Sequence, residues 1–441
     1  MSLLKLAVLC IFISLSESLE NGLVRTPPMG WMSWAKFYCQ TDCLHHPLSC
    51  ISERLYVDMA DRLASDGYLA AGYQYVHIDD CWMAHSRDAQ GKLVANKTRF
   101  PHGMKWLADY VHSKGLKFAT YEDFGTKTCA GYPGSQHHLK TDAQTFASWG
   151  VDYLKLDGCN AQGGVAAYAK GYPTMERELN ATGRPMVYSC SWPAYLPADK
   201  PRPYKAIAEN CNLWRNWNDI SASWKSIQSI IDYFTKYQDD LIPVHGPGSW
   251  NDPDMIVVGN SLDLTVEQCK AQMTIWSIWS APLIMSNDLR YIAKAYKEIL
   301  LNRKVIAIDQ DPLGIWGRMV KKNADISIYV KPVTPVDPKT KAHSYAVAFL
   351  NRNLNQTKTA LVAKLSDLGL NNTDGYNVED LFSGTKHGLL KPTSHFSATV
   401  KSTGVVLIKA TIAQKTAARR MKTKPIDYFD FNEKLVDQWL F

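Results

Sequence analysis

The sequence predicts an α/β fold, a closed (β/α)8 barrel of the TIM type followed by a C-terminal antiparallel β-sandwich. Its 441 residues are too many for one small domain and fit a large barrel with a smaller companion. Short apolar runs that end in polar residues recur eight times before residue 310, and alternating β-branched runs follow. With 46% hydrophobic and 21% charged residues, the composition excludes coiled coil, collagen and wholesale disorder. The net charge of +7 is too small an excess to indicate a nucleic-acid partner.

Residues 1–18 are typical of a secretory signal peptide. Lys5 precedes the apolar run 6–15, and Ser16 and Ser18 flank Glu17 in an arrangement that suits cleavage near Ser18. The alternative, a membrane anchor, needs about 20 apolar residues, and neither this run nor a later one is long enough. We therefore expect a secreted chain without stable membrane insertion, folded in an oxidising compartment.

Residues 19–310 carry a strand-then-helix rhythm. The predicted strands occupy residues 29–34, 75–80, 117–123, 153–157, 185–190, 213–219, 249–254 and 281–286. Their ends are roughly 30 to 40 residues apart, enough for one strand, a loop and a helix. Apolar residues at spacings of three and four predict helices over residues 52–66, 104–114, 142–150, 222–237 and 266–279. Eight such units indicate a closed barrel. The alternative is an open, doubly wound sheet, but this sequence has no G-x-G-x-x-G motif after an early strand.

Residues 311–410 change character. Residues 326–330, 344–350 and 405–410 alternate or run apolar and are rich in β-branched side chains, with turn residues between them. This pattern predicts an antiparallel β-sandwich. Residues 411–441 begin with basic residues and end acidic, which predicts a solvated extension to which we assign no function.

Cysteine usage agrees with secretion. Cys269 lies in an apolar helical stretch and is interpreted as a buried structural thiol. The remaining cysteines after the signal peptide are expected in disulfides, although spacing alone fixes no pairing: Cys39, Cys43, Cys50, Cys81, Cys129, Cys159, Cys190 and Cys211. No metal or cofactor is predicted, because the chain has neither a C-x-x-C pair nor an H-E-x-x-H motif. Four N-x-S/T sequons are open to glycosylation, at Asn96, Asn180, Asn355 and Asn371.

Several aspartates lie at the ends of predicted barrel strands: Asp79, Asp80, Asp157, Asp219 and Asp254. One aspartate there is commonly a loop or helix-cap residue, but the carboxyl ends of all barrel strands meet on one face, so these five converge. Converging carboxylates suit either a divalent cation or the acid and nucleophile of glycoside hydrolysis. Aromatic residues near the same ends offer flat faces to a sugar and favour hydrolysis: Trp34, Tyr121, Trp192 and Trp214.

Five long motifs carry a resemblance to a known family. In chain order they span residues 78–82, 153–159, 190–195, 214–219 and 248–255. With these motifs, and the opening segment from Leu19, the sequence resembles glycoside hydrolase family 27, the lysosomal α-galactosidases and α-N-acetylgalactosaminidases, up to about residue 410. The family fold, a (β/α)8 barrel followed by an antiparallel β-sandwich, agrees with the fold that the pattern predicts.

The resemblance implies roles for the matching residues. Asp157 matches the nucleophile and Asp219 the acid/base of hydrolysis with retention, for which two carboxyls stand ~5 to 5.5 Å apart. Asp79 and Asp80 match the pair that binds the 4- and 6-hydroxyls of the sugar. The other implied substrate contacts are Trp34, Tyr121, Lys155, Cys159, Tyr195, Arg215 and Asp254. The implied disulfides are Cys39–Cys81, Cys43–Cys50, Cys129–Cys159 and Cys190–Cys211.

Lys155 precedes Asp157 by two residues and therefore points to the same side of the predicted strand. Its positive charge is expected to keep the nucleophile ionised. A charge pair inside the barrel is an alternative that is compatible with this role.

The loop after the fifth predicted strand distinguishes the two activities of the family that this sequence resembles. The family's α-galactosidases carry a bulky Glu and Leu in this loop, and its α-N-acetylgalactosaminidases carry Ser and Ala. This chain has Ser191 and Ala194 at these positions. Small side chains leave room for a 2-acetamido group, so we expect glycoconjugates with terminal α-linked N-acetylgalactosamine, and also α-galactose, as substrates. An α-galactosidase specific for galactose and a non-catalytic galactoside-binding protein are the alternatives. The family also implies a homodimer and delivery through the secretory pathway to the lysosome.

Overall fold

The computed structural model describes residues 19, 21–198, 200–322, 325–355 and 358–413. The expected signal peptide, residues 1–18, and residues 414–441 of the expected extension lie outside these ranges. Among the described residues, no helix combines the length and apolar character needed to cross a membrane.

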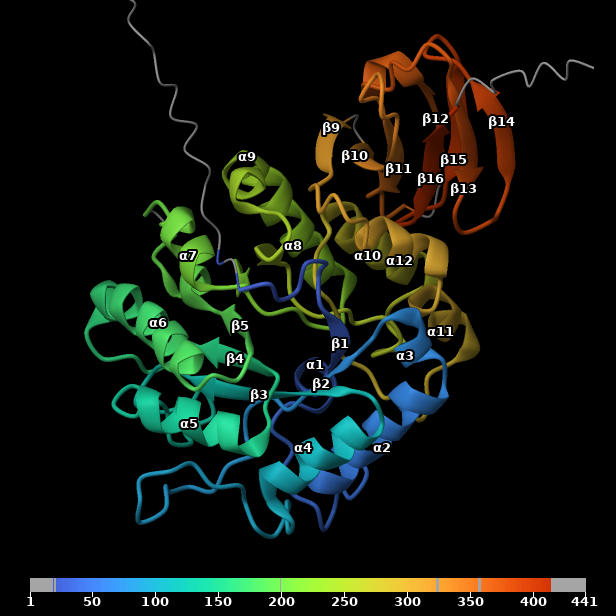
Figure 1. The fold of residues 1–441 in the computed structure, drawn as a ribbon. Helices are drawn as coiled ribbons and strands as arrows, with labels where there is room; N and C mark the ends of the chain where they lie inside the picture. Colours follow the sequence, from blue (N-terminus) through green and yellow to red (C-terminus); the bar gives the residue numbers. More distant parts are fainter. Residues whose placement is uncertain (1–18, 20, 199, 323–324, 356–357, 414–441) are drawn as a thin grey trace, which may run out of the picture.

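Eight parallel strands form the barrel that the sequence predicts (Figure 1). They are β1 (Met29–Met32), β2 (Tyr75–His77), β3 (Lys117–Asp123), β4 (Tyr153–Asp157), β5 (Val187–Cys190), β6 (Leu213–Arg215), β7 (Trp250–Asp252) and β8 (Leu283–Met285). Neighbours run in the order β7-β6-β5-β4-β3-β2-β1-β8. Ile256, just after β7, pairs in parallel with Met285 of β8 and so completes the ring. Most strand residues are buried because helices cover the outside, which explains the continuous apolar runs.

Helices surround the barrel. The five predicted ones appear as α2 (Glu53–Ser65), α4 (Gly103–Ser113), α5 (Leu139–Trp149), α8 (Trp224–Lys236) and α10 (Val266–Trp279). The structure adds α1 (Trp34–Phe37), α3 (Tyr68–Ala71), α6 (Gly164–Ala181), α7 (Tyr204–Asn210), α9 (Gln238–Leu241), α11 (Lys294–Leu300) and α12 (Arg303–Asp309). The longest helix, α6, is not among the predicted ones: Gly171 and Pro173 disfavour a helix interior, although Tyr172, Met175 and Leu179 follow one another at helical spacing.

The second domain is antiparallel, as predicted. Its larger sheet has the order β14-β13-β16-β11-β10-β9, and β12 pairs with β15 in a second sheet. The strands are β9 (Arg318–Lys322), β10 (Ile326–Val336), β11 (His343–Asn351), β12 (Thr359–Lys364), β13 (Tyr376–Asp380), β14 (Lys386–Leu390), β15 (His395–Val400) and β16 (Val405–Ile412). Side chains from both sheets, among them Phe349 and Phe396, form its own apolar core.

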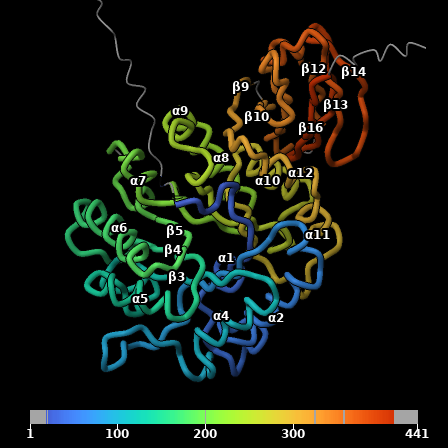
Figure 2. Tube along the Cα trace, viewed as in Figure 1, coloured from blue at the N-terminus to red at the C-terminus, as the bar shows by residue number. Residues whose placement is uncertain are grey.

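Helix α10 joins the two domains. It lies between the barrel and the larger sheet (Figures 1 and 2), packs against β10, β11 and β16, and is buried on nearly all sides. Lys331 of β10 reaches into this junction with no exposed surface. Its Nζ donates to the carbonyl oxygens of Ser277 (2.9 Å) and Ile308 (2.5 Å) and to the hydroxyl of Ser280 (2.6 Å). One cation thus ties the sandwich to the ends of two barrel helices.

Replacing Lys331 should loosen this junction. Lys331→Met leaves buried oxygens at the ends of α10 and α12 without their donor, so we expect the free energy of unfolding to fall by about 2 to 4 kcal/mol. Urea unfolding followed by circular dichroism measures the change. Lys321→Met removes the same kind of side chain from an exposed position on β9 and should change stability by less than about 0.5 kcal/mol. Equal effects of the two variants would show that the buried contacts of Lys331 do not stabilise the protein.

Candidate active site

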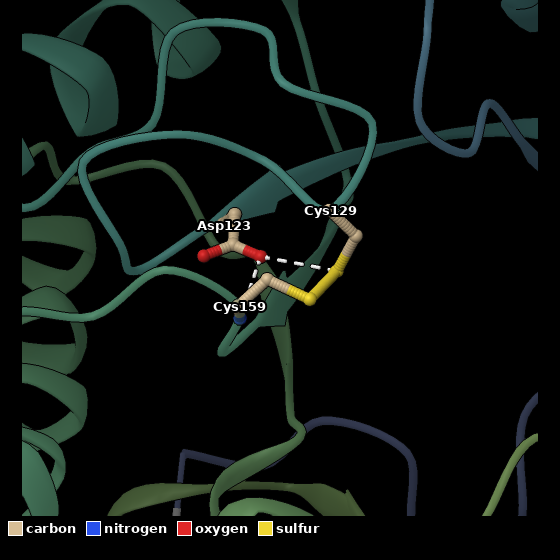
Figure 3. A group of neighbouring side chains, drawn as sticks. All are labelled: Asp123, Cys129 and Cys159. Carbon is tan, nitrogen blue, oxygen red and sulfur yellow. Dashed lines mark hydrogen bonds between the residues drawn. A yellow bond between two sulfur atoms is a disulfide. The ribbon is translucent and has the colours of Figure 1, made fainter.

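Strands β3 and β4 end side by side at the C-terminal face of the barrel. Asp123, the last residue of β3, is in register with Asp157, the last residue of β4. A disulfide between Cys129 and Cys159 joins the loops that follow the two strands (Figure 3). The strand register therefore places two carboxylates and a disulfide in one corner of the face.

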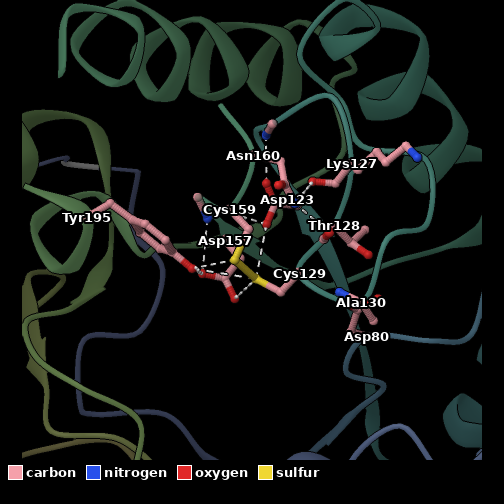
Figure 4. Close-up of a disulfide and its surroundings, with 12 residues drawn as sticks. Asp80, Asp123, Lys127, Thr128, Cys129, Ala130, Asp157, Cys159, Asn160 and Tyr195 are labelled. Carbon is pink, nitrogen blue, oxygen red and sulfur yellow. Dashed lines mark hydrogen bonds between the residues drawn. A yellow bond between two sulfur atoms is a disulfide. The ribbon is translucent and has the colours of Figure 1, made fainter. Parts of the chain in front are cut away.

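The Asp157 carboxylate is held from two sides (Figure 4). Its Oδ1 accepts hydrogen bonds from the Tyr195 hydroxyl at 2.7 Å and from the Gly158 N–H at 3.0 Å. Its Oδ2 lies 3.7 Å from Sγ of Cys129. These two donors fix the direction of the half-buried carboxylate.

Lys155 lies below Asp157 on the same strand and binds Asp79. Its Nζ donates to Asp79 Oδ2 at 2.7 Å, and both side chains are buried. Burial alone lowers the pKa of Lys155, but the negative charges of Asp79 and Asp157 raise it above its usual value. The lysine is therefore a permanent cation between the two aspartates. Burial raises the pKa of Asp79 despite this partner.

The Asp80 carboxylate binds backbone N–H groups. It accepts from the Cys81 N–H at 2.6 Å and from the Ala130 N–H at 2.9 Å. Burial raises its pKa to about 6. Cys81 has a φ of 75°, a conformation rare for a non-glycine residue. Its disulfide to Cys39 holds this turn.

Arg215 links the other two candidate carboxylates. Its Nη2 lies 2.9 Å from Asp219 Oδ1 and 3.1 Å from Asp254 Oδ2. Asp254 is buried at a φ of 78°, and burial raises its pKa to about 6. The Asp219 side chain is 69% exposed, and the charge of Arg215 lowers its pKa. A proton on Asp219, which an acid role requires, is thus disfavoured without substrate, and the sequence does not reveal this.

The Tyr195 hydroxyl binds Asp157 and has a perturbed pKa. The pKa of Tyr195 is raised by burial and by the charges of Asp157, Asp123 and Asp219. Tyr195 lies on a short 3-10 turn, η1 (Trp192–Tyr195), directly after β5. The buried Ser191 and the half-buried Ala194 belong to the same turn, where the Ala194 N–H donates to the Ser191 carbonyl at 3.1 Å. Ser191 and Ala194 therefore share a turn with the tyrosine whose hydroxyl binds Asp157.

Asp123 is the site residue that the sequence reasoning missed. It is buried, and its Oδ1 and Oδ2 accept from the N–H groups of Gly125 (2.6 Å) and Cys159 (2.9 Å). Burial, and then the charge of Asp157, raise its pKa to about 8. The sequence feature that could have identified Asp123 is its position at the end of a predicted strand, two residues after Tyr121.

The expectation that four aromatic rings offer a flat face to a sugar is wrong for three of them, Trp192, Trp214 and Tyr121. Trp192 and Trp214 are 2% and 0% exposed, so neither has a free face. Trp192 stacks on Tyr172, and the Trp214 indole donates to Asn251 Oδ1 at 2.9 Å. They are core residues that support the strand ends. Tyr121 is also buried, under Lys155, and Trp34 is half-buried on α1.

The described cysteines form the four pairs that the resemblance implies: Cys39–Cys81, Cys43–Cys50, Cys129–Cys159 and Cys190–Cys211. Cys269 is buried in α10, and burial raises its pKa to about 11, so the thiol is inert. Among the sequon asparagines, Asn180, Asn355 and Asn371 are exposed and Asn96 is half-buried.

A parallel barrel with an anchored carboxylate, an exposed carboxylate and a buried Asp–Lys pair at its C-terminal face is the architecture of a barrel glycoside hydrolase. Sequence comparison agrees. The α-galactosidase A family matches residues 26–311, and the α-galactosidase C-terminal β-sandwich domain matches residues 324–410. The chain belongs to glycoside hydrolase family 27, the family of these α-galactosidases.

Individual relatives span nearly the whole chain. The chain is 48% identical to the α-N-acetylgalactosaminidase of Gallus gallus over 88% of its own length and 94% of that protein. It is 46% identical to human α-galactosidase A over 89% of its own length and 90% of that protein. The crystal structure of α-galactosidase I from Mortierella vinacea superposes with a TM-score of 0.78 at 30% identity, covering 89% of this chain and 98% of that one.

The buried carboxyls make stability depend on pH. Asp80 has its pKa raised from 3.8 to about 6 on folding, so the folded protein binds more protons than the unfolded chain between these values. Its contribution to stability is complete below about pH 4 and is lost as the pH rises through 6. We expect thermal unfolding to occur at a higher temperature at pH 4.5 than at pH 7.

Asp80→Asn should reduce that pH difference by the equivalent of about 2 kcal/mol or less. Calorimetry at the two pH values measures it. Asp239→Asn, at an exposed carboxylate of α9, is the control and should leave the difference unchanged. If Asp80→Asn keeps the full pH dependence, Asp80 does not titrate as described.

Proposed function

We propose that this chain is a retaining exo-glycosidase. It hydrolyses terminal α-linked N-acetylgalactosamine, and also α-galactose, from glycolipids, glycoproteins and oligosaccharides. The single observation that carries the proposal is the anchored Asp157 carboxylate, which Tyr195 and Gly158 hold beside the cation of Lys155. The named relatives, an α-N-acetylgalactosaminidase and an α-galactosidase, support the substrate class.

Asp157 acts as the nucleophile. Its carboxylate attacks the anomeric carbon, the bond to the aglycone oxygen breaks, and a covalent glycosyl-enzyme forms. The negative charge of Asp157 is lost in this step, and the hydrogen bonds from Tyr195 and Gly158 orient the carboxylate for it beforehand. Water then attacks the same carbon from the other side and releases the sugar with its original configuration.

Asp219 gives a proton to the leaving oxygen and then takes one from the attacking water. Its contact with Arg215 opposes the first step, because a nearby cation stabilises the carboxylate. An aglycone that covers the exposed Asp219 removes water from around it and raises its pKa. Proton donation therefore depends on substrate binding, and an acidic compartment assists it.

Substrate recognition divides between two sides of the pocket. Asp79 and Asp80 bind the 4- and 6-hydroxyls, with Lys155 fixing Asp79 in place. Trp34, Tyr121, Cys159, Arg215 and Asp254 complete the sugar contacts. Ser191 and Ala194 leave room for the 2-acetamido group, where Ser191 hydrogen-bonds its polar end and Ala194 contacts its methyl. Delivery to the lysosome and homodimer formation stay predictions of family membership.

Specificity is tested with aryl α-N-acetylgalactosaminide and aryl α-galactoside. We expect a higher kcat/KM for the first, because a galactoside leaves the space around its 2-hydroxyl unfilled. The double variant Ser191→Glu, Ala194→Leu should fill that space and reverse the preference, with a loss of at least 100-fold on the acetamido sugar, about 3 kcal/mol of discrimination. A clear preference of the unaltered enzyme for galactose would instead support the galactose-specific alternative.

The matched control is Ser229→Glu, which introduces the same charge at an exposed position on α8. It should leave both kcat/KM values unchanged. If it alters the ratio as much as the double variant does, the effect is one of net charge and the steric account is wrong. Absence of turnover of both glycosides by the unaltered protein would favour the non-catalytic alternative.

A further inference from the structure

Glu122 is a buried acid that the proposed reaction does not use. It lies on β3 between Tyr121 and Asp123, and its side chain has no exposed surface. Successive residues of a strand face opposite sides, so Glu122 points away from the side chain of Asp123 and toward the outside of the barrel. There it meets a second fully buried carboxyl, Asp142 of α5, with Ser135 between them.

The hydrogen bonds of Ser135 require a proton on Glu122. The Ser135 hydroxyl oxygen lies 2.6 Å from Asp142 Oδ2 and 3.1 Å from Glu122 Oε1. A hydroxyl has one proton to give, and the shorter contact goes to Asp142, whose two oxygens also accept from Arg87 Nη1 (2.6 Å) and Nη2 (2.7 Å). The contact with Glu122 is therefore a full hydrogen bond only when Glu122 is protonated and donates to the Ser135 oxygen.

The packing around Glu122 does not accommodate its ionised form. Its second oxygen, Oε2, is buried, and no donor among the described residues reaches it. A carboxylate there would be a buried charge without a hydrogen-bond donor, beside the charge of Asp142. Burial, and then the charge of Asp142, raise the pKa of Glu122 well above its usual value; Arg87 opposes this shift and Asp123 adds to it.

Ser135 belongs to the β3–α5 loop, residues 124–138, which joins β3 to α5. Arg87 holds the same stretch, because its Nη2 also donates to the Gly134 carbonyl at 2.8 Å. Gly134 packs so closely on Gly125 that a Cβ atom at Gly134 would lie 2.2 Å from the Gly125 carbonyl oxygen. The two limbs of the loop therefore move together, and an anchor at Ser135 fixes both.

The far end of the β3–α5 loop reaches the proposed sugar site. The Ala130 N–H donates to Asp80 Oδ2 at 2.9 Å (Figure 4), and Cys129 is joined by its disulfide to Cys159. We propose that Glu122 is a positioning residue whose proton holds this loop against the barrel, so that ionisation of Glu122 releases the loop and weakens sugar binding at Asp80. The effect on sugar binding rests on the proposed function, whereas release of the loop does not.

The direction of the pH effect separates Glu122 from the other titrating groups beside the loop. The proton on Glu122 is present at low pH and is lost as the pH rises through its raised pKa, so the loop loosens in that direction. Burial raises the pKa of Asp80 to about 6 and that of Asp123 to about 8, but both accept N–H groups of the loop, so losing their protons strengthens those hydrogen bonds. Burial, and then the charge of Arg87, lower the pKa of His138, so this side chain titrates below the ordinary range of histidine.

Hydrogen exchange of the full secreted chain tests release of the loop without any substrate. It is measured by mass spectrometry between pH 5 and pH 9 and corrected for the intrinsic pH dependence of exchange. We expect protection of residues 124–138 to fall by about tenfold for each pH unit above the pKa of Glu122, because the released loop lets the carboxyl ionise in water. Strand β11 of the second domain is the internal control and should keep its protection. Loop protection that stays constant or rises with pH would overturn the proposal.

Three variants assign the titration. Glu122→Gln keeps a donor for Ser135 and cannot ionise, so its loop should stay protected at pH 9. Glu298→Gln removes an exposed carboxyl on α11 and should keep the pH dependence of the unaltered protein. Ser135→Ala removes the hydroxyl that Glu122 binds and should lower loop protection already at pH 5, with circular dichroism checking that the variant folds. A full pH dependence in folded Glu122→Gln would assign the titration to another group and refute the proposal.

Kinetics on aryl α-N-acetylgalactosaminide test the effect on sugar binding. At pH 5 the unaltered enzyme and Glu122→Gln should have kcat and KM values within about twofold of each other. At a pH where the loop has opened, KM of the unaltered enzyme should exceed that of Glu122→Gln by about tenfold. Equal KM values despite an open loop would refute the effect on sugar binding. Absence of turnover of this glycoside and of the α-galactoside would refute the proposed function and leave the exchange result standing.

Discussion

The Lys155 ammonium group is the charge on which this site depends. Asp79 follows β2 and Asp157 ends β4, with β3 between them, and carboxylates on one barrel face repel one another unless a cation lies near both. Lys155 binds Asp79 at 2.7 Å, and its pKa is raised by both aspartates, so its charge is permanent. Arg215 does the same for Asp219 and Asp254 on the other side. Two buried cations therefore allow Asp79, Asp157, Asp219 and Asp254 to share one end of the barrel.

Alternation along the strands decides which side chains point into the barrel. Side chains two residues apart share a face of a strand, so Tyr153, Lys155 and Asp157 of β4 point inward in succession. The lower layer is apolar and contains Tyr75, Ala119, Tyr153, Val187, Leu213 and Trp250. This layer excludes water from below the charged one. The sandwich supports the barrel from outside through α10, where Lys331 is bound by three oxygens.

Much of this architecture could be predicted from the sequence, because apolar runs and helical spacing depend on local burial. The helix α6 is not predicted because it contains Gly171 and Pro173, which disfavour a helix interior. Contacts between residues at the site are harder to predict from the sequence. Asp123 ends a predicted strand, as Asp157 does, but its hydrogen bond from the Cys159 N–H beside Asp157 follows only from the register of β3 against β4. Trp192 and Trp214 were assigned to the sugar because a sequence does not distinguish a buried ring from an exposed one. The effect of Arg215 on Asp219 likewise requires their geometry.

The central claim is that Asp157 attacks the sugar directly, so that the product keeps the configuration of the substrate. Proton NMR of the first sugar released from an α-glycoside, recorded before the anomers interconvert, tests this claim most directly. The account predicts that the α anomer appears first and converts to the β anomer only with time. Initial release of the β anomer would mean that water, and not Asp157, attacks the anomeric carbon of the substrate, and would contradict the assignment.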